Sequence, residues 1–116
     1  IYTLSLHDAL PIYELYTGLF FDIPKGFEIQ VRARSGLASK YGIGLANGVG
    51  TIDSDYTGEL IIPLINLGEE DYVVKNNDRI AQILLARCER INWQEREEID
   101  KGEGRQDQGF GHTGIE

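Results

Sequence analysis

The chain has 116 residues, of which 41% are hydrophobic and 26% are charged, and this composition predicts one small soluble globular domain. Its formal net charge of −8 argues against a nucleic-acid-binding protein, which would need a basic surface to displace counterions from phosphate. No apolar run approaches the roughly 20 residues that cross a bilayer, so no membrane span is expected.

Glycine and cysteine usage narrow the class of protein further. The 14 glycines predict many tight turns, which favours an all-β fold over a helical bundle. The single cysteine, Cys88, cannot form a disulfide within the chain. We therefore expect a reducing, cytoplasmic compartment.

Residues 1–12 differ in character from the rest of the chain. Their string YTLSLHDALPI resembles a translated sequencing adapter, and a signal peptide is the alternative, although a basic n-region is missing. We expect residues 1–12 to be a non-native leader and residues 13–93 to form the folded core.

Strand patterns begin after this leader. Residues 17–23 are the first predicted strand, and residues 24–26, Pro-Lys-Gly, form the turn that closes it. Residues 27–33 alternate between apolar and polar side chains, which is typical of a half-buried strand.

Two later segments are continuous apolar runs of strand length. Residues 60–65 and 80–86 have the composition of strands that are covered on both faces. Pro63 interrupts the first run, and it predicts an edge, a bulge or a position where the backbone nitrogen has no partner. Residues 72–75 form a further short strand, and helical periodicity is nowhere sustained. Together these segments predict an all-β, jelly-roll-like barrel or sandwich.

After Trp93 the composition becomes charged and rich in glycine. We expect residues 94–116 to be a flexible C-terminal arm outside the core. Arms of this kind often pack on a neighbouring subunit, which suggests an oligomer.

Residues 50–59, GTIDSDYTGE, form the most informative segment for chemistry. In a regular hairpin Asp53 and Asp55 share one face and Tyr56 points to the other. A bulge in the hairpin could turn Tyr56 back into the pocket. An ionised carboxylate at Asp53 could hold a water molecule in line for attack. The alternative is a structural turn that is rich in aspartate.

Three further segments carry groups that suit phosphate or a base. Arg34 and Ser35 offer a guanidinium and a hydroxyl for phosphate, with a solvated strand edge as the alternative. Gln82 interrupts an apolar run, so its amide either binds a ligand or bonds to the backbone. In residues 105–114, Arg105 and Phe110 could close over a polyphosphate and a base, with a disordered tail as the alternative.

Other catalytic classes find no support in the sequence. His7 lies in the leader and His112 in the arm, so neither forms a recognisable nucleophile–base pair. Zinc-ligand spacing of histidine and cysteine is also absent.

Four strings occur in the order of motifs that define a known family. ARSGLA, GTIDSDYTGEL, NDRIAQ and RQDQGFGHTG resemble the second to fifth motifs of the trimeric dUTP pyrophosphatases (dUTPases). The resemblance covers residues 17–114. It implies a jelly-roll-like β fold and a homotrimer with shared active sites that hydrolyse dUTP to dUMP and pyrophosphate, keeping uracil out of DNA.

The resemblance also implies roles for individual residues. Asp53 would position the water that attacks the α-phosphate, and Tyr56 would stack under the deoxyribose. Asn47 would help to read uracil. The remaining expected substrate contacts in this segment are Gly50, Thr51 and Ile52.

Phosphate contacts would come from other subunits. Arg34, Ser35, Gly36 and Gln82 would bind the phosphates. The arm of a third subunit would cover uracil and the γ-phosphate with Arg105, Phe110, Gly111, His112 and Thr113. Mg²⁺ would be carried by the triphosphate, with no direct ligand from this chain.

The sequence departs from the family pattern at three places, and the minor one is Ala33, where the family often has proline. The first motif, an Ala-Gly-x-Asp-Leu strand that should precede Thr17, is not found. Lys101 begins a Lys-Gly-Glu-Gly string and could replace Arg105 as the cation of the fifth motif. Two alternatives therefore stay open: a nucleotide-binding relative with impaired catalysis, and a dCTP deaminase.

Overall fold

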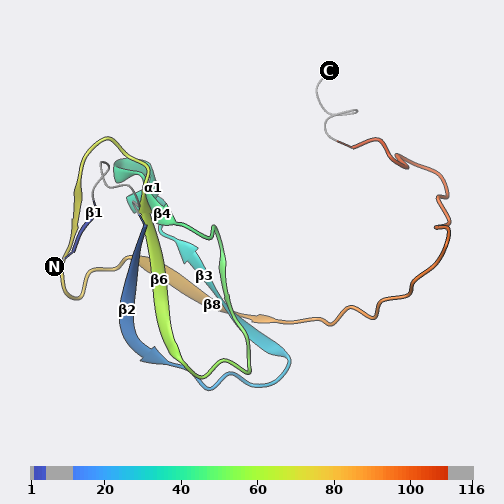
Figure 1. Cartoon of the computed structure of the whole chain (residues 1–116), viewed down its shortest axis with the longest axis horizontal. Coiled ribbons are helices and arrows are strands. Elements are labelled where there is room, and N and C mark those ends of the chain that lie inside the picture. Colours follow the sequence, from blue (N-terminus) through green and yellow to red (C-terminus); the bar gives the residue numbers. More distant parts are fainter. Residues whose placement is uncertain (1, 5–11, 110–116) are drawn as a thin grey trace.

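The computed structural model describes residues 2–4 and 12–109 (Figure 1). In this part of the chain, strands dominate and one short helix is present, which confirms the all-β prediction. The elements are β1 Tyr2–Leu4, β2 Ile12–Phe20, β3 Phe27–Ala33, α1 Ser35–Tyr41, β4 Ile43–Leu45, β5 Gly50–Ile52, β6 Glu59–Asn66, β7 Tyr72–Val74 and β8 Ala81–Arg87.

The strands form two three-stranded antiparallel sheets, ordered β2-β6-β4 and β5-β3-β8, and a small pair, β1-β7. Every second residue of β6 is buried, as alternation along a strand requires. The core unites apolar side chains from both larger sheets with those of flanking segments. Its buried members are Leu15, Ile23, Ile29, Val31, Ile43, Leu45, Ile52, Leu60, Ile62, Leu64 and Val74.

The first long strand lies further towards the N-terminus than the sequence indicated. β2 begins at Ile12, the last residue assigned to the leader, and ends at Phe20 rather than at residue 23. Its register against β6 shifts between Tyr16 and Phe20, around Gly18, which has a φ of 74°. A positive φ is accessible to glycine without strain, so the bulge forms there and ends regular pairing early.

Pro63 lies in the central strand of its sheet, which leaves the third of its three alternatives, a backbone nitrogen without a ladder partner. It pairs with Glu14 of β2, while its carbonyl accepts a hydrogen bond from the Ala46 backbone N–H at 2.8 Å. The N and C=O of one strand residue point to the same side. The Pro63 nitrogen therefore faces the region just past Leu45, where β4 has ended and no ladder partner is needed.

Helix α1 was not predicted from the sequence. Its seven residues bury no side chain, so the apolar periodicity that reveals a helix is missing. It ends at Gly42, whose φ of 71° is left-handed and whose N–H bonds to the carbonyl groups of Leu37 and Ala38.

Strand β8 was expected to be covered on both faces, and this is wrong for the described protomer. β8 is the edge of its sheet, and Ile83 and Leu85 are 46% and 61% exposed. Contiguous exposed apolar side chains on an unpaired strand edge are typical of a protein–protein contact.

Beyond β8, residues 88–109 contain no helix or strand and extend away from the sheets (Figure 1). No helix among the described residues has the length and apolar character needed to span a membrane.

Two glycines form a close backbone crossing between the end of α1 and the turn after β6. Leu67 donates its N–H to the Gly42 carbonyl at 2.8 Å, and Gly68 donates to the buried Asn66 side chain at 2.9 Å. A Cβ on Gly68 would collide with the Tyr41 carbonyl oxygen. Only glycine lets the two segments approach this closely.

We expect Gly68→Ala to lower the free energy of unfolding by about 1–3 kcal/mol or more, because rigid backbone must move to make room. Gly44→Ala is the matched control, since a Cβ there meets nothing within 4 Å. Urea denaturation of both variants measures the difference. Equal midpoints would show that the crossing is not tight.

Candidate functional site

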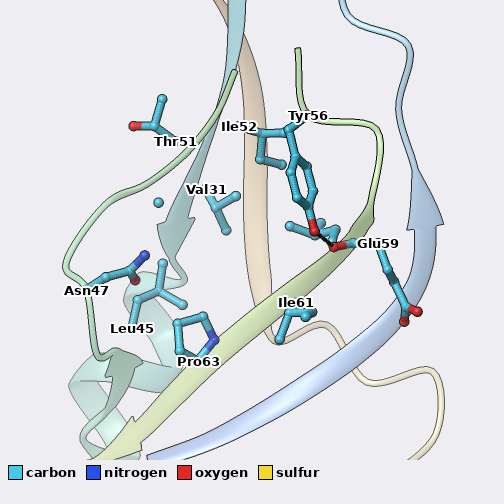
Figure 2. A pocket seen from close by; sticks show the side chains of 11 residues that line it. Val31, Leu45, Asn47, Thr51, Ile52, Tyr56, Glu59, Ile61 and Pro63 are labelled. Atoms are coloured by element: carbon cyan, nitrogen blue, oxygen red, sulfur yellow. Dashed lines mark hydrogen bonds between the residues drawn. The ribbon is translucent and has the colours of Figure 1, made fainter. Parts of the chain in front are cut away.

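A cavity of about 190 Å³ opens beside the loop that follows β5 (Figure 2). An engineered protein cavity of about 150 Å³ accepts benzene, so this one has room for a single six-membered ring. Figure 2 shows Asn47 and Tyr56 on opposite sides of it. Its lining comprises Val31, Leu45, Asn47, Gly50, Thr51, Ile52, Tyr56, Glu59, Leu60, Ile61 and Pro63.

The two polar ends of this cavity are set by local structure. Asn47 lies in the turn after β4, where the Gly48 N–H bonds to the Leu45 carbonyl at 3.1 Å and Gly48 has a φ of 74°. A Cβ on Gly50 would lie 3.3 Å from the Asn47 amide nitrogen, so glycine leaves room for that side chain. Five of the expected site residues therefore line one cavity: Asn47, Gly50, Thr51, Ile52 and Tyr56.

Asp53 faces a different hollow on the other side of the same loop. It shares this open cavity of about 530 Å³ with Asp55, Cys88 and Arg90. The Tyr56 backbone N–H bonds to the Asp53 carbonyl at 3.1 Å, which closes the turn between them. Asp53 and Asp55 thus line one cavity and Tyr56 lines another. The expected hairpin is not formed, because β5 and β6 belong to different sheets and the segment between them is a turn.

The phosphate-binding candidates lie at the far end of β3. Ile29 pairs with Ile52, next to Asp53, whereas Arg32 pairs with Gln82. At about 3.3 Å per residue, Asp53 is roughly 20 Å from Arg34 along the sheet. One protomer therefore keeps the carboxylate apart from the phosphate-binding candidates, which include Ser35 and Gly36 at the start of α1.

Gln82 is exposed rather than buried, and its amide donates to the Ala33 carbonyl at 3.1 Å. This is the internal backbone bond that the sequence left open. Its amide oxygen has no hydrogen-bond partner among the described residues and can accept a bond. Arg34 lines a cavity of about 640 Å³ together with Lys75 and Arg79.

The described part of the arm extends away from the sheets that carry the cavity residues and the phosphate-binding candidates (Figure 1). Arg105 lies in a local turn, where its Nε donates to the Gln108 carbonyl at 2.7 Å. Lys101 is exposed, so both remain candidates for the cation of the arm. Phe110, Gly111, His112 and Thr113 lie outside the described residues. Among residues 2–4 and 12–109, no group of three acidic, histidine or cysteine side chains could hold a metal ion.

A family model described as dUTPase matches residues 10–114. The chain belongs to the dUTPase family.

Curated dUTPases named deoxyuridine 5'-triphosphate nucleotidohydrolase are similar over most of this chain. The protein from Finegoldia magna is 53% identical over 99 residues, 85% of this chain and 68% of the relative. The one from Anaplasma marginale is 48% identical over 102 residues, 85% of this chain and 67% of the relative. The chain thus spans about two thirds of the length of these relatives.

Solved dUTPase structures share the fold. The dUTPase from phage phi11 of S. aureus superimposes with a TM-score of 0.71 at 19% identity, covering 85% of this chain and 78% of that one. The Staphylococcus bacteriophage 80alpha dUTPase G164S mutant with dUpNHpp gives a TM-score of 0.68 at 22% identity, covering 90% and 80%. The dUTPase-type jelly-roll expectation is confirmed.

Two features of this dUTPase site were not found from the sequence. Glu59 holds the Tyr56 hydroxyl through its backbone carbonyl, and a main-chain acceptor leaves no signature in the residue type. Cys88 lies in the Asp53 cavity, where its thiol donates a hydrogen bond to the Glu28 carboxylate. That bond is the main cause that raises the pKa of the Cys88 thiol.

We expect Glu28→Gln to accelerate the reaction of Cys88 with a disulfide reagent at pH 8. Losing the carboxylate lowers the pKa of the thiol, and the thiolate is the reactive form. Because Cys88 is the single cysteine, the absorbance of the released thiolate reports on this side chain alone. Unchanged kinetics between pH 7 and 9 would contradict the assigned bond.

Proposed function

We propose that this chain hydrolyses dUTP to dUMP and pyrophosphate by attack of a water molecule on the α-phosphate. The observation that carries the proposal is the ring-sized cavity between Asn47 and Tyr56, directly beside the Asp53 loop. Uracil occupies this cavity with its polar edge towards Asn47, and the deoxyribose lies against the Tyr56 ring.

Asp53 is the proposed catalytic residue. It is exposed at the rim of an open cavity, so its carboxylate is accessible to a bound water. It orients that water and takes its proton as the oxygen forms a bond to the α-phosphorus. The bond from that phosphorus to the bridging oxygen then breaks, and pyrophosphate leaves with the electron pair.

Mg²⁺ is the proposed cofactor, held mainly by the substrate. Mg²⁺ prefers carboxylate and phosphate oxygens and often binds through one or two carboxylates plus substrate phosphates. No group among the described residues offers the three ligands of a dedicated site, and the proposal assigns no direct ligand to this chain. When bound, the ion neutralises the triphosphate and stabilises the leaving pyrophosphate.

The complete site is proposed to form between protomers of a homotrimer. The roughly 20 Å between Asp53 and Arg34 along β3 is too long for one protomer to hold both the attacked phosphorus and its phosphate ligands. The exposed apolar edge of β8 supports association of copies. A second protomer then supplies Arg34, Ser35, Gly36 and Gln82 to the phosphates.

The extended arm is proposed to reach a third protomer. Residues 88–109 run away from their own sheets, which suits a segment that packs elsewhere (Figure 1). The arm brings Arg105 or Lys101 to the phosphates and Phe110, Gly111, His112 and Thr113 over the base. These cations provide local positive charge on a chain whose net charge is −8. The exposed unpaired thiol of Cys88 supports a reducing, cytoplasmic setting.

We expect Asp53→Asn to reduce pyrophosphate release from dUTP by about 10²–10⁴-fold, as loss of a general base does. The amide keeps the size of the side chain, so dUTP binding should change little. The control is Asp22→Asn, an exposed aspartate outside both cavities, with activity near that of the unchanged chain. A coupled assay for pyrophosphate, with Mg²⁺ and then with a chelator, measures the effect.

Two outcomes of this assay would favour other functions. Ammonia released from dCTP would indicate a deaminase. Tight dUTP binding without pyrophosphate, in the unchanged chain with Mg²⁺, would indicate a nucleotide-binding protein.

A further inference from the structure

Tyr56 is held by hydrogen bonds at its backbone and at its hydroxyl, although the residue is 44% exposed. Its backbone N–H bonds to the Asp53 carbonyl at 3.1 Å, and its hydroxyl donates to the Glu59 carbonyl at 2.6 Å (Figure 2). An exposed aromatic side chain normally samples several rotamers. Here the hydroxyl bond selects the one that places the ring in the wall of the cavity.

Gly58 provides the space in which the ring lies. A Cβ at this position would be 2.7 Å from the Tyr56 hydroxyl oxygen and 2.8 Å from the ring carbon that carries it. The φ of Gly58 is not in the left-handed region, so conformational freedom does not explain the glycine. Its missing side chain does, because the ring packs directly on the Gly58 backbone.

The residue whose carbonyl receives the hydroxyl is tied to the bulge in β2 through its side chain. The Gly18 N–H donates to the Glu59 carboxylate at 3.0 Å, and the Thr17 hydroxyl donates to the Leu60 carbonyl at 2.7 Å. The residue that accepts the Tyr56 bond and the residue after it are thus both tied to β2. Glu59 also pairs with Phe20, so the acceptor belongs to strand β6 and not to the exposed loop.

We infer that Gly58 and Glu59 are positioning residues that fix the Tyr56 ring in the cavity wall and so set the selection of 2'-deoxyribose over ribose. The inference rests on the proposed function, which places the sugar against this ring. A 2'-hydroxyl pressed on a fixed aromatic face loses water and gains no partner. A ring that can move away accommodates the hydroxyl and keeps it hydrated.

Equilibrium binding of dUDP and UDP tests the inference, because neither ligand can release pyrophosphate. The measured quantity is the ratio of the UDP to the dUDP dissociation constant, obtained by calorimetry with the full chain. An apolar pocket rejects an added hydroxyl by about a hundredfold, so we expect a ratio of that order. We expect Gly58→Ala to lower this ratio about tenfold by displacing the ring.

Gly44→Ala is the matched control, because the same change there meets open space and leaves the ratio unchanged. Tyr56→Phe keeps the ring and removes only the bond to Glu59, so we expect a smaller drop in the ratio of about two- to tenfold. In a Tyr56→Ala background, Gly58→Ala should have no further effect on the ratio, since no ring is left to displace.

The possible failures are distinct. If Gly58→Ala leaves the ratio of the two dissociation constants unchanged, even while it weakens the binding of both UDP and dUDP, the inference is wrong and the proposed function stands. An effect of Gly58→Ala that persists without the Tyr56 ring also overturns it. A chain that binds neither dUDP nor UDP contradicts the proposed function itself.

Discussion

The pairing of β3 with two neighbours is the constraint on which the site depends. β3 pairs along its whole length with β8 and, around Val31, with β5. Val31 and Ile29 are buried, so a slip of one residue would expose both side chains and bury their charged neighbours. This fixed register places the Asp53 loop at one end of β3 and Arg34 with Gln82 at the other.

A strand of fixed length therefore separates Asp53 from Arg34 in each copy. In the proposed homotrimer, assembly brings Asp53 and Arg34 together only where a triphosphate lies between them. The proposed assembly also accounts for the exposure of Ile83 and Leu85 on β8.

Much of this could be predicted from the sequence, because strands with one buried face show their period directly. The alternation from Phe27 to Ala33 predicted β3 with its observed bounds. Helix α1 buries nothing, so no periodic signal existed, and the exposure of β8 depends on tertiary arrangement that an apolar run does not reveal. The segment around Asp53 was predicted to carry catalytic chemistry. The hydroxyl bond from Tyr56 to Glu59 was not predicted, because a backbone acceptor leaves no signature in the residue type. The roles of the site residues stay predictions.

Mixed oligomers test most directly whether each site is shared. Asp53→Asn and Arg34→Ala chains, each almost inactive alone, are unfolded together, refolded and assayed for pyrophosphate release from dUTP. If the two residues of a site come from different protomers, random mixing restores both to about a quarter of the sites. Activity should then recover to about that fraction of the unchanged protein. If each site lay within one protomer, no mixed oligomer would contain an intact one, and absence of recovery would contradict the account.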